Sequence, residues 1–169
     1  GGDRPLFLFV NLMETHLPYT CDVADVAAAR GDGAVNGARR AAALVTDERA
    51  SAHLHGIDPI DEATIRDLGA AYDGAVRTAD RVTGEILDLL GREGLLGNAV
   101  VAVCGDHGEN LGEHGDLNHL MSVREPVLHV PLVIRWPGRR EGGRVEDAEV
   151  RLQDVYPTLL AAARVAMPA

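Results

Sequence analysis

The sequence is poor in aromatic residues and in cysteine, and it has no long apolar run. Aromatic residues make up 4% of the 169 residues, so a packed core must be built mainly from aliphatic side chains. The two cysteines, Cys21 and Cys104, lie far apart, which is unlike a disulfide framework or a cysteine-rich zinc site. The longest apolar runs, residues 5–10, 99–104 and 130–134, are too short to cross a bilayer.

Positive charge is also scarce. The formal net charge is −10, and no basic run is longer than the pairs Arg39–Arg40 and Arg139–Arg140. This balance argues against binding a nucleic-acid backbone or an anionic membrane surface through bulk charge. It does not exclude a small anionic substrate, because a bound metal ion can dominate the field around it. We therefore expect neither a nucleic acid nor a membrane as partner.

Short apolar runs alternate with helical patterns along the chain. The runs that predict buried strands are residues 6–11, 99–104 and 129–134. Apolar residues at spacings of three and four predict a long helix over residues 59–90, capped by Asp58, and a last helix over residues 152–165. Residues 21–56 are expected to form short helices and loops. Strands that alternate with helices predict an α/β fold, a mostly parallel sheet sandwiched by helices, in one domain.

Polar loops follow the first two predicted strands, at the end of an α/β sheet where ligands bind. His16 lies in the first loop, and Asp106 and His107 lie in the second between two glycines. A carboxylate and an imidazole are both ligands for a divalent cation, but two neighbours do not complete a coordination sphere. From the spacing alone, the Asp-His pair could equally cap a turn. His16 and His119 could equally be solvated loop residues.

Several segments carry motifs in a shared order. They are residues 11–19 (NLMETHLPY), 72–90, 105–115 (GDHGENLGEHG), 129–138 (HVPLVIRWPG) and 154–160 (DVYPTLL). These segments resemble the N-x-x-x-x-H-x-P-Y, D-H-G-E…L-G-E-H-G, V-P-L-I-I-x-x-P-G and D-x-x-P-T-L-L motifs of the sulfatase family. That family belongs to the alkaline-phosphatase superfamily. The similarity extends over nearly the whole chain and implies an alkaline-phosphatase-like α/β fold.

The resemblance implies roles for four residues. Asp106 and His107 would be ligands of a divalent metal ion, with calcium expected before magnesium or manganese. His16 would contact the sulfate or phosphate group of the substrate. His119 falls where the family places a lysine or histidine that contacts the same group or the leaving oxygen, although residues 120–125 (LMSVRE) depart from the usual L-Y-E-E pattern. A cation and histidine donors would stabilise the charge that develops as the leaving oxygen departs.

The C/S-x-P-x-R motif, from which the family makes its formylglycine nucleophile, is missing from the sequence. No cysteine or serine is followed by proline two positions later, and the family's early Asp-Asp metal-ligand pair is also missing. We therefore interpret residues 1–169 as a partial sulfatase catalytic domain, incomplete because it lacks the N-terminal nucleophile and the first metal-ligand segment.

Three functions remain open from the sequence. The leading prediction is a metal-dependent sulfuric ester hydrolase whose catalysis requires the missing N-terminal part. Its substrate would be a small-molecule or glycan sulfate or phosphate ester. A phosphodiesterase or phosphonate monoester hydrolase of the same superfamily is the enzymatic alternative, because an Asp-His pair stands where many sulfatases have Asp-Asn. The third possibility is a non-catalytic remnant that keeps the fold and half of the site.

Overall fold

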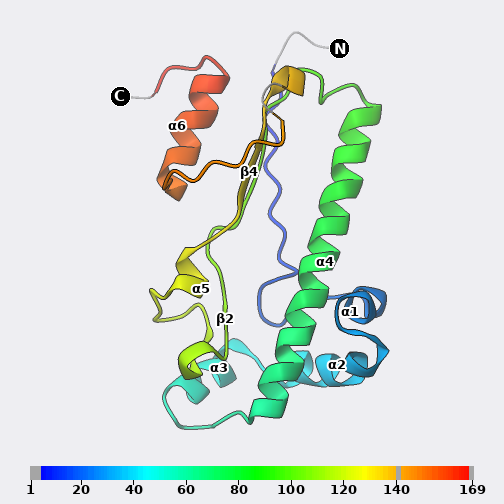
Figure 1. The fold of residues 1–169 in the computed structure, drawn as a ribbon, viewed down its shortest axis with the longest axis vertical. Coiled ribbons are helices and arrows are strands. Elements are labelled where there is room, and N and C mark those ends of the chain that lie inside the picture. The colour runs from blue at the N-terminus through cyan, green and yellow to red at the C-terminus, as the bar shows by residue number, and fades with distance from the viewer. Residues whose placement is uncertain (1–4, 140–141, 168–169) are drawn as a thin grey trace. The chain divides into compact units, whose positions relative to one another are not determined.

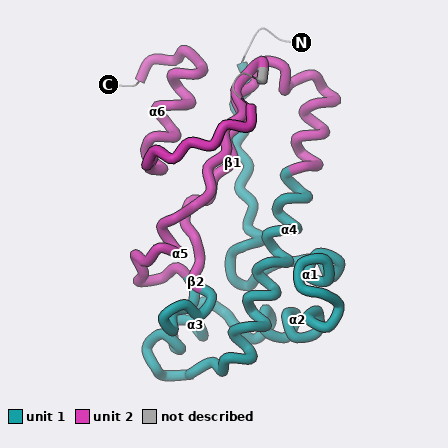
Figure 2. Tube along the Cα trace, in the orientation of Figure 1, with its two compact units in different colours: residues 1–83, 111–118 teal, residues 84–110, 119–169 magenta. Residues whose placement is uncertain are grey.

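The computed structural model describes residues 5–139 and 142–167 (Figure 1). The chain divides into two compact units, distinguished by colour in Figure 2. Unit 1 comprises Gly1–Thr83 and Leu111–Asn118, and unit 2 comprises Gly84–Asn110 and His119–Ala169.

Unit 1 is helical and holds the main hydrophobic core. Its elements are α1 (Val23–Arg30), η1 (Asp32–Ala34), α2 (Val35–Leu44), α3 (Asp47–Leu54), most of α4 (Glu62–Arg92), η2 (Glu113–Gly115) and β3 (Leu117–Asn118). The predicted short helices over residues 21–56 are therefore confirmed. Most buried side chains of the core are aliphatic, as the shortage of aromatic residues predicted. Tyr19 joins them and packs edge-on against Tyr72, with ring centroids 5.3 Å apart.

The predicted long helix is confirmed as α4, but its cap is not Asp58. The Asp61 carboxylate accepts a hydrogen bond from the backbone N–H of Thr64 at 2.9 Å and another from its hydroxyl at 2.8 Å. These hydrogen bonds, the backbone one first, lower the pKa of Asp61. Asp58 instead pairs with Arg49 at 3.0 Å. The cap prediction was wrong because Asp61 directly precedes the first helical residue, where its carboxylate reaches the third helical N–H.

Close packing of α1 on α4 depends on Gly74. A Cβ atom at this position would lie 2.5 Å from Cγ2 of Val26, a side chain that is fully buried. Glycine therefore allows the two helices to approach more closely than any other residue would.

Unit 2 contains β1 (Val101–Cys104), α5 (Glu125–Leu128), β4 (Leu132–Arg135), η3 (Pro137–Arg139), α6 (Leu152–Ala162) and the end of α4. β1 pairs with β4 in an antiparallel register that sets Val101 opposite Arg135 and Cys104 opposite Leu132. The strands predicted in residues 99–104 and 129–134 thus exist and share a sheet, each beginning a little later than predicted. The predicted last helix is confirmed as α6, which ends at Ala162.

The prediction of a strand over residues 6–11 was wrong. These residues have no regular secondary structure, and the side chains of Phe7 and Phe9 are 83% and 76% exposed. A strand exists only where a neighbouring strand accepts its backbone hydrogen bonds, and an apolar run does not provide that neighbour.

The sheets of the described residues are small. Besides β1 and β4, β2 (Asn110–Leu111) pairs with β3, and no parallel strand pair occurs in the described part of the chain. The predicted, mostly parallel sheet therefore stays unconfirmed, whereas the combination of helices with strands is observed. Among these residues, no helix is both long enough and apolar enough to span a membrane.

Candidate functional site: a histidine-carboxylate cluster after strand β1

The loop that follows β1 is held against α5 by backbone hydrogen bonds. The N–H of Gly108 donates to the carbonyl of Val127 at 2.7 Å, and the N–H of Glu109 donates to the carbonyl of Pro126 at 3.1 Å. A Cβ atom at position 108 would lie only 1.9 Å from the Pro126 carbonyl oxygen. Glycine is therefore the residue that lets this loop lie against α5, and this contact fixes the backbone between His107 and Glu109.

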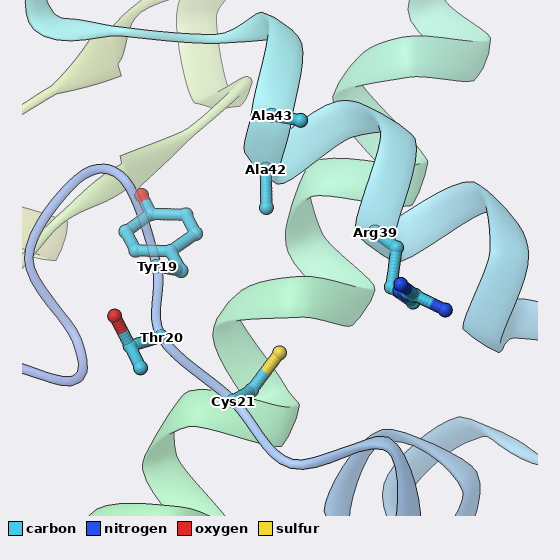
Figure 3. Close-up of a pocket in the computed structure, with 6 residues that line it drawn as sticks. All are labelled: Tyr19, Thr20, Cys21, Arg39, Ala42 and Ala43. Carbon is cyan, nitrogen blue, oxygen red and sulfur yellow. The ribbon is translucent and has the colours of Figure 1, made fainter.

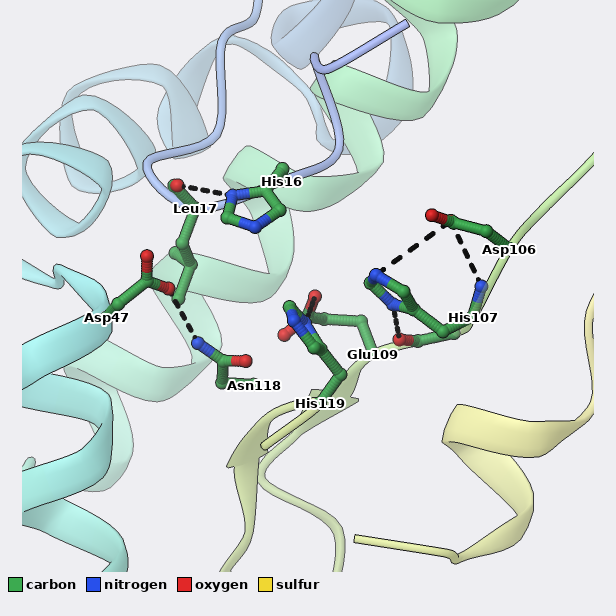
Figure 4. Close-up of polar contacts among 9 residues, drawn as sticks. His16, Leu17, Asp47, Asp106, His107, Glu109, Asn118 and His119 are labelled. Carbon is green, nitrogen blue, oxygen red and sulfur yellow. Dashed lines mark hydrogen bonds and ion pairs between the residues drawn. The ribbon is translucent and has the colours of Figure 1, made fainter. Parts of the chain in front are cut away.

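Three side chains of unit 2 form a compact cluster in this region (Figure 4). Each of His107, Glu109 and His119 offers one donor atom, and these atoms all lie within 4.8 Å of one another. Oε2 of Glu109 is 3.3 Å from Nδ1 of His119, and the two imidazole rings stack with centroids 3.9 Å apart at 31°. The Glu109 side chain is 3% exposed, whereas those of His119 and His107 are 20% and 35% exposed.

The hydrogen bonds of His107 determine which of its nitrogens is available. Its Nδ1 lies 2.9 Å from the carbonyl oxygen of Gly108. A carbonyl oxygen only accepts hydrogen bonds, so Nδ1 carries the proton and Nε2 of the neutral ring carries the lone pair. The neighbouring Asp106 has its Oδ1 3.8 Å from this Nε2, and its side chain is 89% exposed.

The carboxylate oxygen of Asp106 and Nε2 of His107 fit a divalent metal ion as ligand atoms. Imidazole nitrogen and carboxylate oxygen are common ligands of such ions, and bonds of about 2.0–2.4 Å bring two donors to within about 4–5 Å of each other. The separation between Asp106 Oδ1 and His107 Nε2 meets this condition. The backbone bond from His107 Nδ1 is also the kind of outer contact that orients a metal-binding histidine.

The four residues singled out from the sequence do not all lie in one unit. His107 and His119 come together, and Asp106 lies beside His107 as its sequence neighbour. His16 belongs to unit 1, where it is half-buried and its Nδ1 lies 2.7 Å from the carbonyl oxygen of Leu17. The role expected for His16, contact with the sulfate or phosphate group of the substrate, stays a prediction.

Sequence reasoning assigned no role to Glu109, which is the most buried member of the cluster. The sequence feature that could have indicated a role for Glu109 is its position two residues after His107 in a glycine-rich loop. The contact with His119 spans ten residues and arises from the fold. Glu113, in the same glycine-rich segment of the sequence, accepts a hydrogen bond from the N–H of Leu111 at 2.6 Å.

A shallow hollow of about 340 Å³ lies elsewhere, within unit 1 (Figure 3). It is lined by Tyr19, Thr20, Cys21, Arg39, Ala42 and Ala43. Burial raises the pKa of the Cys21 thiol, and the carboxylates of Asp22 and Asp25 raise it further. A thiol of raised pKa stays protonated near neutral pH, so Cys21 is a poor nucleophile. The candidate site is therefore the cluster of His107, Glu109 and His119 rather than this hollow.

Curated relatives of this chain are sulfatases and a related phosphatase-superfamily protein. This chain is 39% identical to Arylsulfatase K of Xenopus laevis over 110 residues, which are 65% of this chain and 20% of that protein. It is 36% identical to human Arylsulfatase K over 104 residues, which are 62% of this chain and 19% of that protein. It is also 30% identical over 117 residues to the multifunctional alkaline phosphatase superfamily protein PehA of Trinickia caryophylli, covering 66% of this chain and 23% of that protein.

The chain thus spans about a fifth of the length of the curated relatives it matches. The sulfatase family model covers residues 1–165, and thus nearly the whole chain. The sequence motifs, the histidine-carboxylate loop after β1 and this match agree, and the chain belongs to the sulfatase family.

Proposed function

We propose that this chain forms part of the metal and substrate site of a metal-dependent sulfuric ester hydrolase. The observation that carries the proposal is the cluster of His107, Glu109 and His119, which brings His119 against two residues of the loop that resembles the family's D-H-G-E motif. The substrate would be a small-molecule or glycan sulfate ester.

Asp106 and His107 would hold the metal ion. Support comes from the 3.8 Å between Oδ1 of Asp106 and Nε2 of His107, and from the bond that keeps the proton of His107 on Nδ1. When bound, a divalent ion would supply positive charge to a substrate oxygen. Calcium remains the expected ion, and magnesium is the second oxygen-binding candidate. Manganese is the other alternative, because it also takes carboxylate oxygen ligands.

His119 and His16 would act on the substrate itself. An imidazole N–H can donate a hydrogen bond to a sulfuryl oxygen or to the leaving oxygen, which stabilises the charge that develops there. His119 is suited to this because it is partly exposed while its ring is held in place by Glu109 and His107. For His16, the support is its place in the family motif and a ring whose Nδ1 lies 2.7 Å from the Leu17 carbonyl.

The nucleophile would come from a part of the protein outside this chain. The sequence has no C/S-x-P-x-R motif, and the raised pKa of Cys21 is unsuited to nucleophilic attack at neutral pH. We further propose that a larger, mostly parallel sheet forms when the remaining part of the catalytic domain is present, and that this part covers the exposed residues 6–10.

A phosphate diester or phosphonate monoester is the second candidate substrate. It is favoured by the similarity to a relative described as a multifunctional alkaline phosphatase superfamily protein. Sulfate and phosphate esters present similar oxygens and differ mainly in charge. The residues of the cluster can contact either ester.

The deciding experiment uses the complete polypeptide that contains this chain. We expect it to hydrolyse 4-nitrophenyl sulfate faster than bis(4-nitrophenyl) phosphate or a phenylphosphonate monoester. Asp106→Ala and His107→Ala should each lower kcat/KM by about 100-fold or more, because even outer contacts of metal ligands are worth about 10–100-fold. Both variants should also weaken metal binding measured by calorimetry.

His129→Ala is the matched control, because the His129 side chain is 80% exposed and pairs with Glu125 on the surface. It should leave turnover and metal binding unchanged. Faster turnover of the phosphate substrates would favour the second candidate, and no turnover of any ester would favour a non-catalytic remnant. Unchanged metal binding in both Asp106→Ala and His107→Ala would reject the assigned ligands.

A further inference from the structure

Glu109 is buried in a place where a carboxylate is costly. Its side chain is 3% exposed, and ionised carboxylates are rarely buried unless a partner compensates for the lost water. One partner is His119, whose Nδ1 lies 3.3 Å from Oε2 of Glu109. The chain thus places a buried charge-bearing group directly against a residue expected to touch the substrate.

This contact restricts the orientation of the His119 ring. The contact sets the Nδ1 edge of the ring against Oε2 of Glu109, so the second nitrogen, Nε2, lies on the other side of the ring. One face of the ring stacks on His107 at 3.9 Å. With one edge and one face fixed, few orientations remain for the imidazole.

The position of Glu109 is itself determined by the backbone. Its N–H donates to the carbonyl of Pro126, and Gly108 lies too close to that carbonyl to admit any side chain. The loop contact with α5 therefore fixes the backbone from which the Glu109 side chain reaches His119.

We propose that Glu109 is a positioning residue, which orients His119 so that Nε2 faces the sulfuryl group or the leaving oxygen of the substrate. This inference rests on the proposed function of His119. Glu109 contacts no substrate atom in this proposal and acts through the imidazole, in the way that a carboxylate orients a catalytic histidine in other hydrolases.

The kinetic test compares Glu109→Gln, His119→Ala and the double variant in the complete polypeptide. Glu109→Gln keeps the size of the side chain and removes its charge. We expect it to lower kcat for an aryl sulfate about 10–100-fold while KM changes less than about threefold. The double variant should be no slower than His119→Ala, because a residue that acts through another adds nothing once that residue is gone.

The matched control is Glu125→Gln. Glu125 and His129 form a similar pair, with Oε1 and Nδ1 3.0 Å apart, but their side chains are 81% and 80% exposed. This substitution should change neither kcat nor KM. Thermal melts of all variants would verify that they are folded.

A second measurement tests the orientation of the His119 ring directly. In protein labelled with ¹⁵N-histidine, NMR should detect the proton of His119 on Nδ1, and Glu109→Gln should shift or remove that signal. Glu109→Leu, which cannot accept a hydrogen bond, should have the larger effect. The Nδ1 signal of His119 should not respond to Glu125→Gln.

The outcomes separate this inference from the proposed function. No turnover by the wild-type protein would count against the proposed function, and the NMR comparison would still test the contact between Glu109 and His119. If the wild-type protein is active but the kinetic effects of Glu109→Gln and His119→Ala multiply, Glu109 acts independently and the inference is wrong. An Nδ1 signal unaffected by Glu109→Leu would also overturn it.

Discussion

At the scale of single residues, the two thiols of the chain differ in their surroundings. Cys21 is half-buried, and burial followed by the charges of Asp22 and Asp25 raises its pKa. Cys104 is exposed at the end of β1. Only the thiolate reacts with alkylating agents, so the environment of each thiol governs its reactivity.

We predict that iodoacetamide alkylates Cys21 more slowly than Cys104 at pH 8. The raised pKa keeps a smaller fraction of Cys21 as thiolate, so the difference should be largest below its pKa and should shrink as the pH rises above it. Rates can be measured by mass spectrometry on Cys21→Ser and Cys104→Ser, each of which leaves one thiol. Removing a neighbouring charge with Asp22→Asn should accelerate Cys21, and alkylation of Cys21 as fast as that of Cys104 would contradict the assignment.

At the scale of elements, the contact between the site loop and α5 depends on one glycine. We predict that Gly108→Ala destabilises the protein by about 1–3 kcal/mol, the usual cost of forcing an extra group into a packed site. The added Cβ would meet the backbone carbonyl of Pro126, which cannot move aside as a flexible side chain could. Urea unfolding measures this loss.

Gly97→Ala is the control for this substitution. Gly97 also lies in unit 2, but a Cβ atom there meets nothing within 4 Å. It should therefore leave the free energy of unfolding nearly unchanged. Equal stability of the Gly108→Ala and Gly97→Ala proteins would show that the loop does not depend on this close approach.

The elements predicted correctly from the sequence are those whose pattern is local. The helical spacing of apolar residues gave α4 and α6 because a helix satisfies its hydrogen bonds within one segment. A strand depends on a partner elsewhere in the chain. The apolar runs that contain β1 and β4 pair with each other, whereas residues 6–11 have no strand partner in the described residues.

The same distinction applies to the candidate site. His107 and His119 could be named from motifs because their residue types and spacing are visible in the sequence. The burial of Glu109 and its contact with His119 could not be read in this way. They depend on how the loop after β1 lies against α5, which is a tertiary contact made by backbone hydrogen bonds and permitted by Gly108.

At the scale of the whole molecule, the chain exposes an unusual amount of apolar surface. In unit 1, five consecutive apolar residues, Leu6, Phe7, Leu8, Phe9 and Val10, are between 47% and 83% exposed. In unit 2, α6 has no buried residue, and Val133 of β4 is 63% exposed. Contiguous apolar surface of this kind marks a region that another part of a protein covers.

We predict that the isolated chain, residues 1–169, associates or aggregates in solution, because unpaired strand edges and exposed apolar residues both favour intermolecular contacts. Phe7→Lys with Phe9→Lys should reduce this association by charging the most exposed part of residues 6–10. In the complete polypeptide the same pair should instead lower the melting temperature, because we propose that the remaining part of the catalytic domain buries these residues there. Size-exclusion chromatography with light scattering measures the first effect, and calorimetry measures the second. A monomeric isolated chain with a sharp cooperative melt would show that these residues need no cover, and would contradict the proposed burial by another part of the domain.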